Sequence, residues 1–89
     1  MVSFVFTKFA EKRFSRVSPE IQQRILSKLK KLKTHPDILA VLKPLHKFKP
    51  ATHRLRIGDF RLILQLSINQ AGEKELLVLD VGHRREVYH

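Results

Sequence analysis

Residues 53–66, HRLRIGDFRLILQL, decide the fold of this chain. Two runs of alternating apolar and polar residues flank the pair Gly58-Asp59 in this stretch. A Gly-Asp pair in such a setting predicts a two-residue loop between antiparallel strands. The loop also fixes the register, because it places Arg56 opposite Arg61. The stretch therefore predicts a β-hairpin whose facing residues can be named.

The predicted hairpin sorts its side chains into two sets, because successive side chains of a strand point to opposite faces. The basic set is Arg54, Arg56 and Arg61. The apolar set, which we expect helices to cover, is Leu55, Ile57, Phe60, Leu62 and Leu64. Like charges opposite each other destabilise a hairpin by up to about 1 kcal/mol. Three arginines on one face therefore favour a bound anion such as phosphate, whose geometry the guanidinium fork matches; the alternative is a face that is merely solvated.

The N-terminal part of the chain predicts a strand and two helices. Residues 2–6 are β-branched and aromatic, which is typical of a strand. Thr7 can cap a first helix, whose apolar positions are Phe9, Ala10, Phe14 and Val17. Ser18-Pro19 starts a second helix that we expect to end at about Thr34. Its apolar stripe is Ile21, Ile25, Leu29 and Leu32.

The rest of the chain completes an α+β fold. Residues 37–51 are irregular and basic, and we expect one short strand at 45–48. A turn is predicted within 68–74, followed by a buried central strand around 76–79, which is apolar on both faces. We therefore expect a single domain, residues 1–89, with two N-terminal helices packed on one face of a small, mainly antiparallel sheet of four to five strands.

The charge of the chain points to a polyanionic partner. Its 89 residues contain 18 Lys and Arg against 8 Asp and Glu, a net charge of +10. The absence of cysteine excludes disulfides and thiolate chemistry, and no metal-binding spacing occurs, so we expect no metal or other cofactor. Without a long apolar run or a secretory signal, the chain is expected to be cytoplasmic and to have no membrane partner.

Further basic residues gather before the hairpin and after the last predicted strand. The candidates for RNA binding are Lys43, His46, Lys47, Lys49, His53, Arg56 and Arg85. The aromatic residues Phe48 and Tyr88 are interleaved with them and can stack on bases. Basic side chains with interleaved aromatic groups indicate a nucleic-acid interface.

Two segments together resemble the RelE/ParE superfamily of bacterial and archaeal toxins: HRLRIGDFRLIL at 53–64 and VGHRREVY at 81–88. The order strand, helix, helix, strands agrees, so the resemblance covers nearly the whole chain. It implies a compact RNase-like fold and a cognate antitoxin. For the RelE branch it implies mRNA cleavage in the ribosomal A site, and for the ParE branch it implies inhibition of DNA gyrase.

The resemblance also implies roles for individual residues. The positions that match catalytic residues of the RelE branch are Arg54, Arg61, Arg84 and Tyr88. His83 stands where relatives carry Lys or His, and Lys47 and Lys49 lie near further catalytic lysines. The combination of Arg61, Arg84 and Tyr88 favours the RelE branch over the ParE branch.

Metal-free RNA cleavage needs a base for the 2′-OH, positive charge on the phosphorane and an acid for the 5′-oxygen. Arg61 and Arg84 are our candidates for the charge, because guanidinium groups stay protonated. His83 titrates near neutral pH, and surrounding cations lower the pKa of a tyrosine such as Tyr88. We therefore assign Arg54, Arg61, His83, Arg84 and Tyr88 as the candidate catalytic residues.

Each of these candidates has a structural alternative. His83 can finish a turn, and Tyr88 can cover the sheet edge or stack on the scissile base. Arg56 can pair with Asp59 or Glu86 instead of RNA. The histidines His35 and His46 are expected to be surface residues.

The leading hypothesis is the toxin of a type II toxin–antitoxin system, a metal-independent endoribonuclease that cuts mRNA on the ribosome. Its expected partners are an acidic antitoxin, mRNA and the 16S rRNA region of the ribosomal A site. The alternatives are a ParE-like inhibitor of DNA gyrase and a non-catalytic RNA- or ribosome-binding module.

Overall fold

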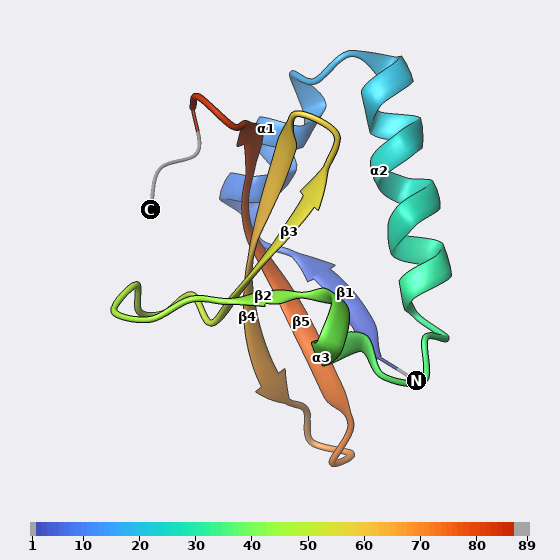
Figure 1. Ribbon diagram of the computed structural model, residues 1–89, viewed down its shortest axis with the longest axis vertical. Helices are drawn as coiled ribbons and strands as arrows, with labels where there is room; N and C mark the ends of the chain where they lie inside the picture. Colours follow the sequence, from blue (N-terminus) through green and yellow to red (C-terminus); the bar gives the residue numbers. More distant parts are fainter. Residues whose placement is uncertain (1, 87–89) are drawn as a thin grey trace.

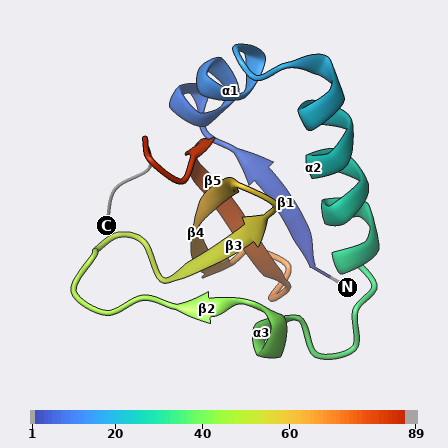
Figure 2. The same cartoon turned by 45° about the horizontal axis from the view of Figure 1, so that its top comes forward.

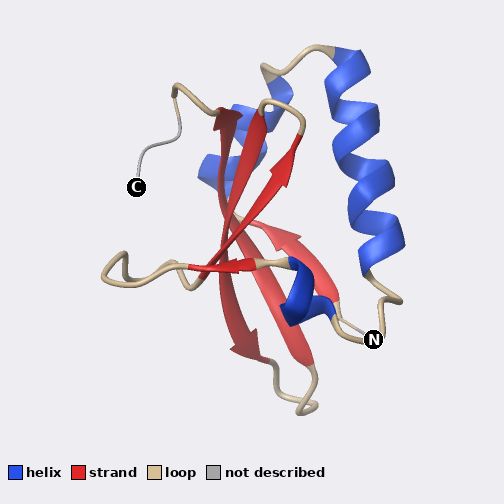
Figure 3. Cartoon of the chain, in the orientation of Figure 1, coloured by secondary structure: helices blue, strands red, loops and turns tan. Residues whose placement is uncertain are grey.

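The computed structural model describes residues 2–86 and contains one five-stranded sheet (Figures 1 and 3). The strands are β1 (Ser3–Phe6), β2 (Lys43–Pro44), β3 (His53–Ile57), β4 (Phe60–Ile68) and β5 (Lys74–His83). Their order across the sheet is β1-β5-β4-β3-β2. β1 pairs with β5 in parallel, and the remaining pairs are antiparallel. The expected α+β fold with a mainly antiparallel sheet is confirmed, and β5 lies inside the sheet as expected.

Two helices cover one face of this sheet (Figure 2). They are α1 (Lys8–Ser15) and α2 (Pro19–Leu32), and a single turn, α3 (Ile38–Val41), follows them. The main core joins helix and sheet residues: Ala10, Ile25, Leu29, Leu32, Leu55, Leu62, Leu64, Leu76, Val78 and Val81. No helix within residues 2–86 is long and apolar enough to cross a membrane.

Both long helices begin where the capping residues predict. The Thr7 hydroxyl accepts the Ala10 N–H at 3.1 Å, and the Ser18 hydroxyl accepts the Ile21 N–H at 3.4 Å. α2 ends at Leu32, two residues before the expected end. Phe9 departs from the predicted apolar stripe, since it is 60% exposed and lies beneath the guanidinium of Arg13.

The hairpin has the predicted register. Arg56 is paired with Arg61 and Leu55 with Leu62, so the basic and apolar sets occupy opposite faces of the sheet. Gly58 has a φ of 59°, a left-handed conformation that glycine adopts without steric cost. The guanidinium of Arg24 in α2 also lies close to this turn. A Cβ on Gly58 would be only 3.2 Å from its Nη2 atom.

The prediction of a short strand at 45–48 is wrong. The chain pairs earlier, as β2, where Lys43 lies opposite Arg54, and residues 45–51 form a loop. Leu45 instead packs on a second small apolar cluster formed by Ala51 and Ile63. The loop then turns at Lys47, whose φ is 67°. α3 was not expected either, and its Ile38 is buried in the main core.

Candidate nucleic-acid interface

Three arginines occupy the face of the β3–β4 hairpin that the helices leave open, and we call Arg54, Arg56 and Arg61 the arginine face. Arg56 lies opposite Arg61, and Arg54 lies opposite Ile63. Arg56 is exposed, whereas Arg54 and Arg61 are half-buried, and the Nε atom of Arg61 is buried. Desolvation by burial, followed by the charges of Arg61 and Arg56, lowers the pKa of Arg54. A bound anion would relieve this repulsion.

The basic loop before the hairpin is anchored to the same face as the arginines. Ile63 shares the face of Arg54, its partner across the hairpin, and it packs with Ala51. Leu45 and Leu79 complete that small apolar cluster. Because the two ends of the loop are held there, its exposed candidates stand beside the arginine face: His46, Lys47 and Lys49. Lys43 is exposed on β2 opposite Arg54.

His53 begins the hairpin and is half-buried. Its Nδ1 atom lies 2.9 Å from the hydroxyl of Thr52, which also accepts the backbone N–H of Leu66 at 2.8 Å. Desolvation by burial lowers the pKa of His53 below its usual value of 6.5. The imidazole is therefore neutral at neutral pH, and it can bind RNA by hydrogen bonding rather than by charge.

A β-bulge in β5 determines where His83 points. The partner of Ile63 is Asp80, whereas the partner of the next residue, Leu64, is Val78. After the bulge, His83 lies opposite Phe60, on the helix side of the sheet. Its ring makes an edge-to-face contact with Phe60, with 5.6 Å between the centroids. The structure therefore does not bring His83 to the arginine face.

His83 also organises the turn that follows β5. Its Nδ1 accepts the Arg85 N–H at 3.2 Å, and the Glu86 carboxylate accepts the His83 N–H at 3.1 Å. Since Nδ1 acts as an acceptor, the ring N–H lies on Nε2. These contacts support the alternative in which His83 finishes a turn.

Arg84 is held at the tip of the hairpin. Its N–H donates to the Asp59 carbonyl at 2.7 Å, and its Nε lies 4.0 Å from the Asp59 carboxylate. Of the two carboxylates that the sequence offers Arg56, Asp59 faces Arg84 and Glu86 accepts the His83 N–H. Arg85 is exposed in the turn after β5. Tyr88 lies outside the described residues.

Sequence reasoning missed a residue that positions this region. The Nε of Arg13 in α1 donates to the Asp80 carboxylate at 3.0 Å and to the Val81 carbonyl at 3.3 Å. The same Asp80 oxygen accepts the Val81 N–H at 2.8 Å. Arg13 therefore ties α1 to the bulge from which the end of β5 departs. A basic residue on a short helix carries no sequence feature that predicts this contact.

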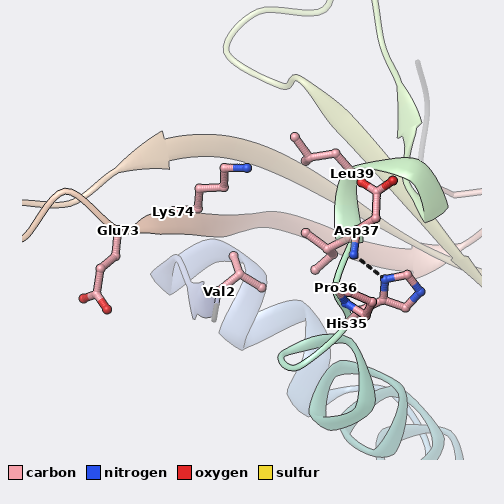
Figure 4. A pocket seen from close by; sticks show the side chains of 8 residues that line it. Val2, His35, Pro36, Asp37, Leu39, Glu73 and Lys74 are labelled. Carbon is pink, nitrogen blue, oxygen red and sulfur yellow. Dashed lines mark hydrogen bonds between the residues drawn. The ribbon is translucent and has the colours of Figure 1, made fainter.

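The pocket in Figure 4 is a different kind of site. It has a volume of about 350 Å³ and lies between the α2–α3 connection and the start of β5. His35 accepts the Asp37 N–H at 3.0 Å through its Nδ1. Glu73 and Lys74 line it as well, so the pocket has mixed charge and does not resemble a phosphate site. Within residues 2–86, no three His, Asp or Glu side chains are grouped to hold a metal ion.

The chain matches a known protein-family model. The model for the ParE toxin of the type II toxin–antitoxin system parDE matches residues 4–88. No curated protein matches the chain at a significant level.

Several solved structures share the fold. The RelBE2 toxin–antitoxin complex of Mycobacterium tuberculosis contains a chain with a TM-score of 0.72 and 24% identity, covering 92% of this chain and 96% of that one. A chain of the archaeal RelE–RelB complex from Pyrococcus horikoshii has a TM-score of 0.67 and 19% identity, covering 97% of this chain and 98% of that one. A chain of the intact RelBE complex of E. coli has a TM-score of 0.63 and 20% identity, covering 91% of this chain and 94% of that one. At these identities the likeness concerns the fold.

Proposed function

From the arginine face, we propose that this chain, which belongs to the ParE toxin family of type II toxin–antitoxin systems within the RelE/ParE superfamily, is a toxin that cleaves mRNA. The proposed reaction is metal-independent and takes place on the ribosome, in the cytoplasm. The RelE/ParE superfamily expected from the hairpin and C-terminal motifs is confirmed by the match over residues 4–88.

The arginine face is the observation that supports an RNase. Arg54, Arg56 and Arg61 are held on two rigid, paired strands, and Arg54 is half-buried beside the other two. Such an arrangement destabilises the free protein, because like charges face each other at a cost of up to about 1 kcal/mol. A phosphorane carries more negative charge than the phosphodiester it forms from, so fixed guanidinium groups stabilise the transition state more than the ground state.

The proposed reaction is attack of a ribose 2′-oxygen on the adjacent phosphorus. The new O2′–P bond forms while the P–O5′ bond breaks. The 2′-hydroxyl proton passes to a base, and the leaving 5′-oxygen takes a proton from an acid. The products are a 2′,3′-cyclic phosphate and a 5′-hydroxyl, which distinguishes this route from hydrolysis by an activated water.

We assign the phosphorane charge to Arg61 with Arg54, and proton transfer to Tyr88. Tyr88 is assigned from the family resemblance alone. For His83, the contacts with Phe60 and Arg85 favour a role in ordering the turn after β5. Arg84 is paired with Asp59 only through a long, exposed contact of 4.0 Å, a kind of pair worth little in water, so RNA can displace it.

The partners proposed for the toxin are mRNA, the ribosome and a cognate antitoxin. The three solved structures compared above are complexes of toxins with antitoxins. A net charge of +10 complements an acidic antitoxin as well as RNA. The two partners would then compete for overlapping basic surface, which explains how an antitoxin silences the toxin.

Cell-free translation tests the proposed reaction. Purified protein is added to ribosomes translating a defined mRNA, and cuts are mapped by primer extension with wild-type protein, Arg61→Ala and Arg16→Ala. Arg16 is an exposed arginine that follows α1, so its removal matches the charge change. We expect cuts with wild type and Arg16→Ala but not with Arg61→Ala, and products with 5′-hydroxyl ends. Equal cutting by all three proteins would refute the assignment.

Inhibition of DNA gyrase is the second candidate, because the matching family model is that of the ParE toxin. A supercoiling assay with purified gyrase and relaxed plasmid separates the two candidates. Loss of supercoiling without mRNA cleavage in the translation assay would replace the RNase with a gyrase inhibitor.

A further inference from the structure

Two hollows meet where α2 passes the outer edge of β3. One has a volume of about 360 Å³ and is lined by Gln23, Arg24, Ser27, Lys28, Lys31 and Ile57. The other has a volume of about 290 Å³ and is lined by Lys28, Val41, Lys43, Arg54, Leu55 and Arg56. Lys28 lines both, so the hollows are adjacent, and we call the two together the α2–β3 groove. Figure 2 shows the end of β3 directed toward α2.

The charge of the groove has one sign. Its cations are Arg24, Lys28, Lys31, Lys43, Arg54 and Arg56, and no carboxylate among residues 2–86 lines either hollow. The pocket of Figure 4, of similar volume, contains both Asp37 and Glu73. A groove lined by cations from three elements concentrates anions from solution.

Compensation of the helix dipole explains only part of this charge. The favourable effect of cations falls off within the last turn of a helix, which in α2 holds Lys30 and Lys31. Arg24 and Lys28 lie further toward the N-terminus. With Lys31 they follow the spacing i, i+4, i+7, which places all three on one face of α2. That face is the wall of the groove.

The groove is continuous with the arginine face. Arg54 and Arg56 belong to both, and the Arg24 guanidinium closes on the Gly58 turn that joins β3 to β4. A strand that places one phosphate on the arginine face can therefore continue over the edge of β3 toward α2.

We propose that the α2–β3 groove binds the phosphate backbone of RNA on one side of the reacting phosphate. RNA fits better than an acidic protein segment, because the apolar lining is limited to Val41, Leu55 and Ile57, of which Leu55 is buried. Protein interfaces depend on buried apolar anchors, whereas backbone contacts to nucleic acid depend on charge. The inference rests on the proposed function for the identity of the polyanion.

The test compares two triple variants that remove equal charge. The groove variant is Arg24→Gln, Lys28→Gln, Lys31→Gln. The control is Lys8→Gln, Lys12→Gln, Arg16→Gln, which removes exposed cations in and next to α1. Binding of a fully 2′-O-methylated single-stranded RNA, which cannot undergo 2′-oxygen attack, is measured against salt concentration. Glutamine maintains helix propensity, and thermal melts verify folding.

Each single-strand phosphate contact contributes about −0.7 to the slope of log K against log salt. We therefore expect the groove variant to have a slope less steep by about 2, since three contacts are removed. The control is expected to keep the wild-type slope. Equal slopes for both triple variants would overturn the proposal, because only net charge would then matter. Loss of affinity for the acidic antitoxin with an unchanged RNA slope would overturn it in favour of a protein partner.

The outcome is separable from that of the proposed RNase. If wild-type protein shows the groove-dependent slope yet cuts no mRNA, the groove stands and the nuclease is refuted. If it cuts mRNA while the groove cations leave the slope unchanged, the nuclease stands and the groove is refuted.

Discussion

The two faces of the hairpin differ completely although the same strands build them. On the helix side, Leu62 and Leu64 are fully buried against α1 and α2. On the open side, Ile63 lies between these two leucines in the sequence and packs in a small apolar cluster. The half-buried Arg61 precedes them on the same open side. Because strand side chains alternate, one segment supplies stability on one face and concentrated charge on the other. Sequence neighbours in β4 should therefore fail in different ways when they are truncated.

The largest expected effect belongs to the open face. Arg61→Ala should lower mRNA cleavage by about 10²–10³-fold, which is typical of removing one donor that stabilises transition-state charge. Its unfolding free energy should change by less than about 1 kcal/mol, because the lost packing is offset by relief from Arg56. Arg61→Lys keeps the charge and loses the guanidinium fork, so its cleavage rate should lie between those of wild type and Arg61→Ala. Cleavage rates and urea denaturation measured on the same samples check this; inactivity accompanied by unfolding would contradict it.

Leu62→Ala is the matched test on the covered face. Leu62 is fully buried, so truncation should destabilise the protein by about 2–5 kcal/mol through lost burial and the cavity left behind. The fraction that stays folded should cleave mRNA at the wild-type rate per molecule. Urea denaturation gives the first quantity, and activity normalised to folded protein gives the second. A stable but inactive Leu62→Ala protein would erase the distinction between the faces.

The third prediction concerns Arg13, which ties α1 to the bulge of β5. Its Nε donates to Asp80 and to the Val81 carbonyl at the bulge of β5. Arg13→Ala should cost about 1.5–3 kcal/mol, the range for hydrogen bonds that involve charged groups, and partial exposure places the cost toward the lower end. A double-mutant cycle with Asp80→Ala measures the coupling. Additive effects of the two single variants would show that the bridge contributes no stability.

The hairpin and both helix starts could be predicted because their causes are local. A Gly-Asp turn fixes the register, and the hydroxyls of Thr7 and Ser18 satisfy N–H groups three residues later. β2 and α3 could not be predicted, since neither has a local cause. The chain pairs at Lys43–Pro44 because Leu45 and Ala51 are drawn to Ile63 on the open face, a contact between distant residues.

The candidate site was predictable to the same degree. The arginine face follows from the register, and the register follows from the turn. The direction of His83 does not, because it depends on the bulge between Ile63 and Leu64 in the β4–β5 ladder. Unbroken alternation from the buried Leu76 would point His83 to the open face, and one extra residue in β5 reverses it. The cations of α2 were predictable in spacing, but their meeting with β3 requires the tertiary fold.

The smallest expected effect is a pH dependence of stability at the start of the hairpin. Burial lowers the pKa of His53 below 6.5, so the folded protein binds this proton less readily than the unfolded chain. The neutral imidazole therefore contributes stability fully above about pH 6.5, and that stability is lost as the pH falls from there toward the folded-state pKa. His53→Gln, which does not titrate, should have a flatter dependence of unfolding free energy on pH in this window. The exposed His46→Gln serves as the control, and urea denaturation at a series of pH values measures the difference. If His53→Gln and wild type differ by the same free energy at every pH, the imidazole is not desolvated in the folded protein.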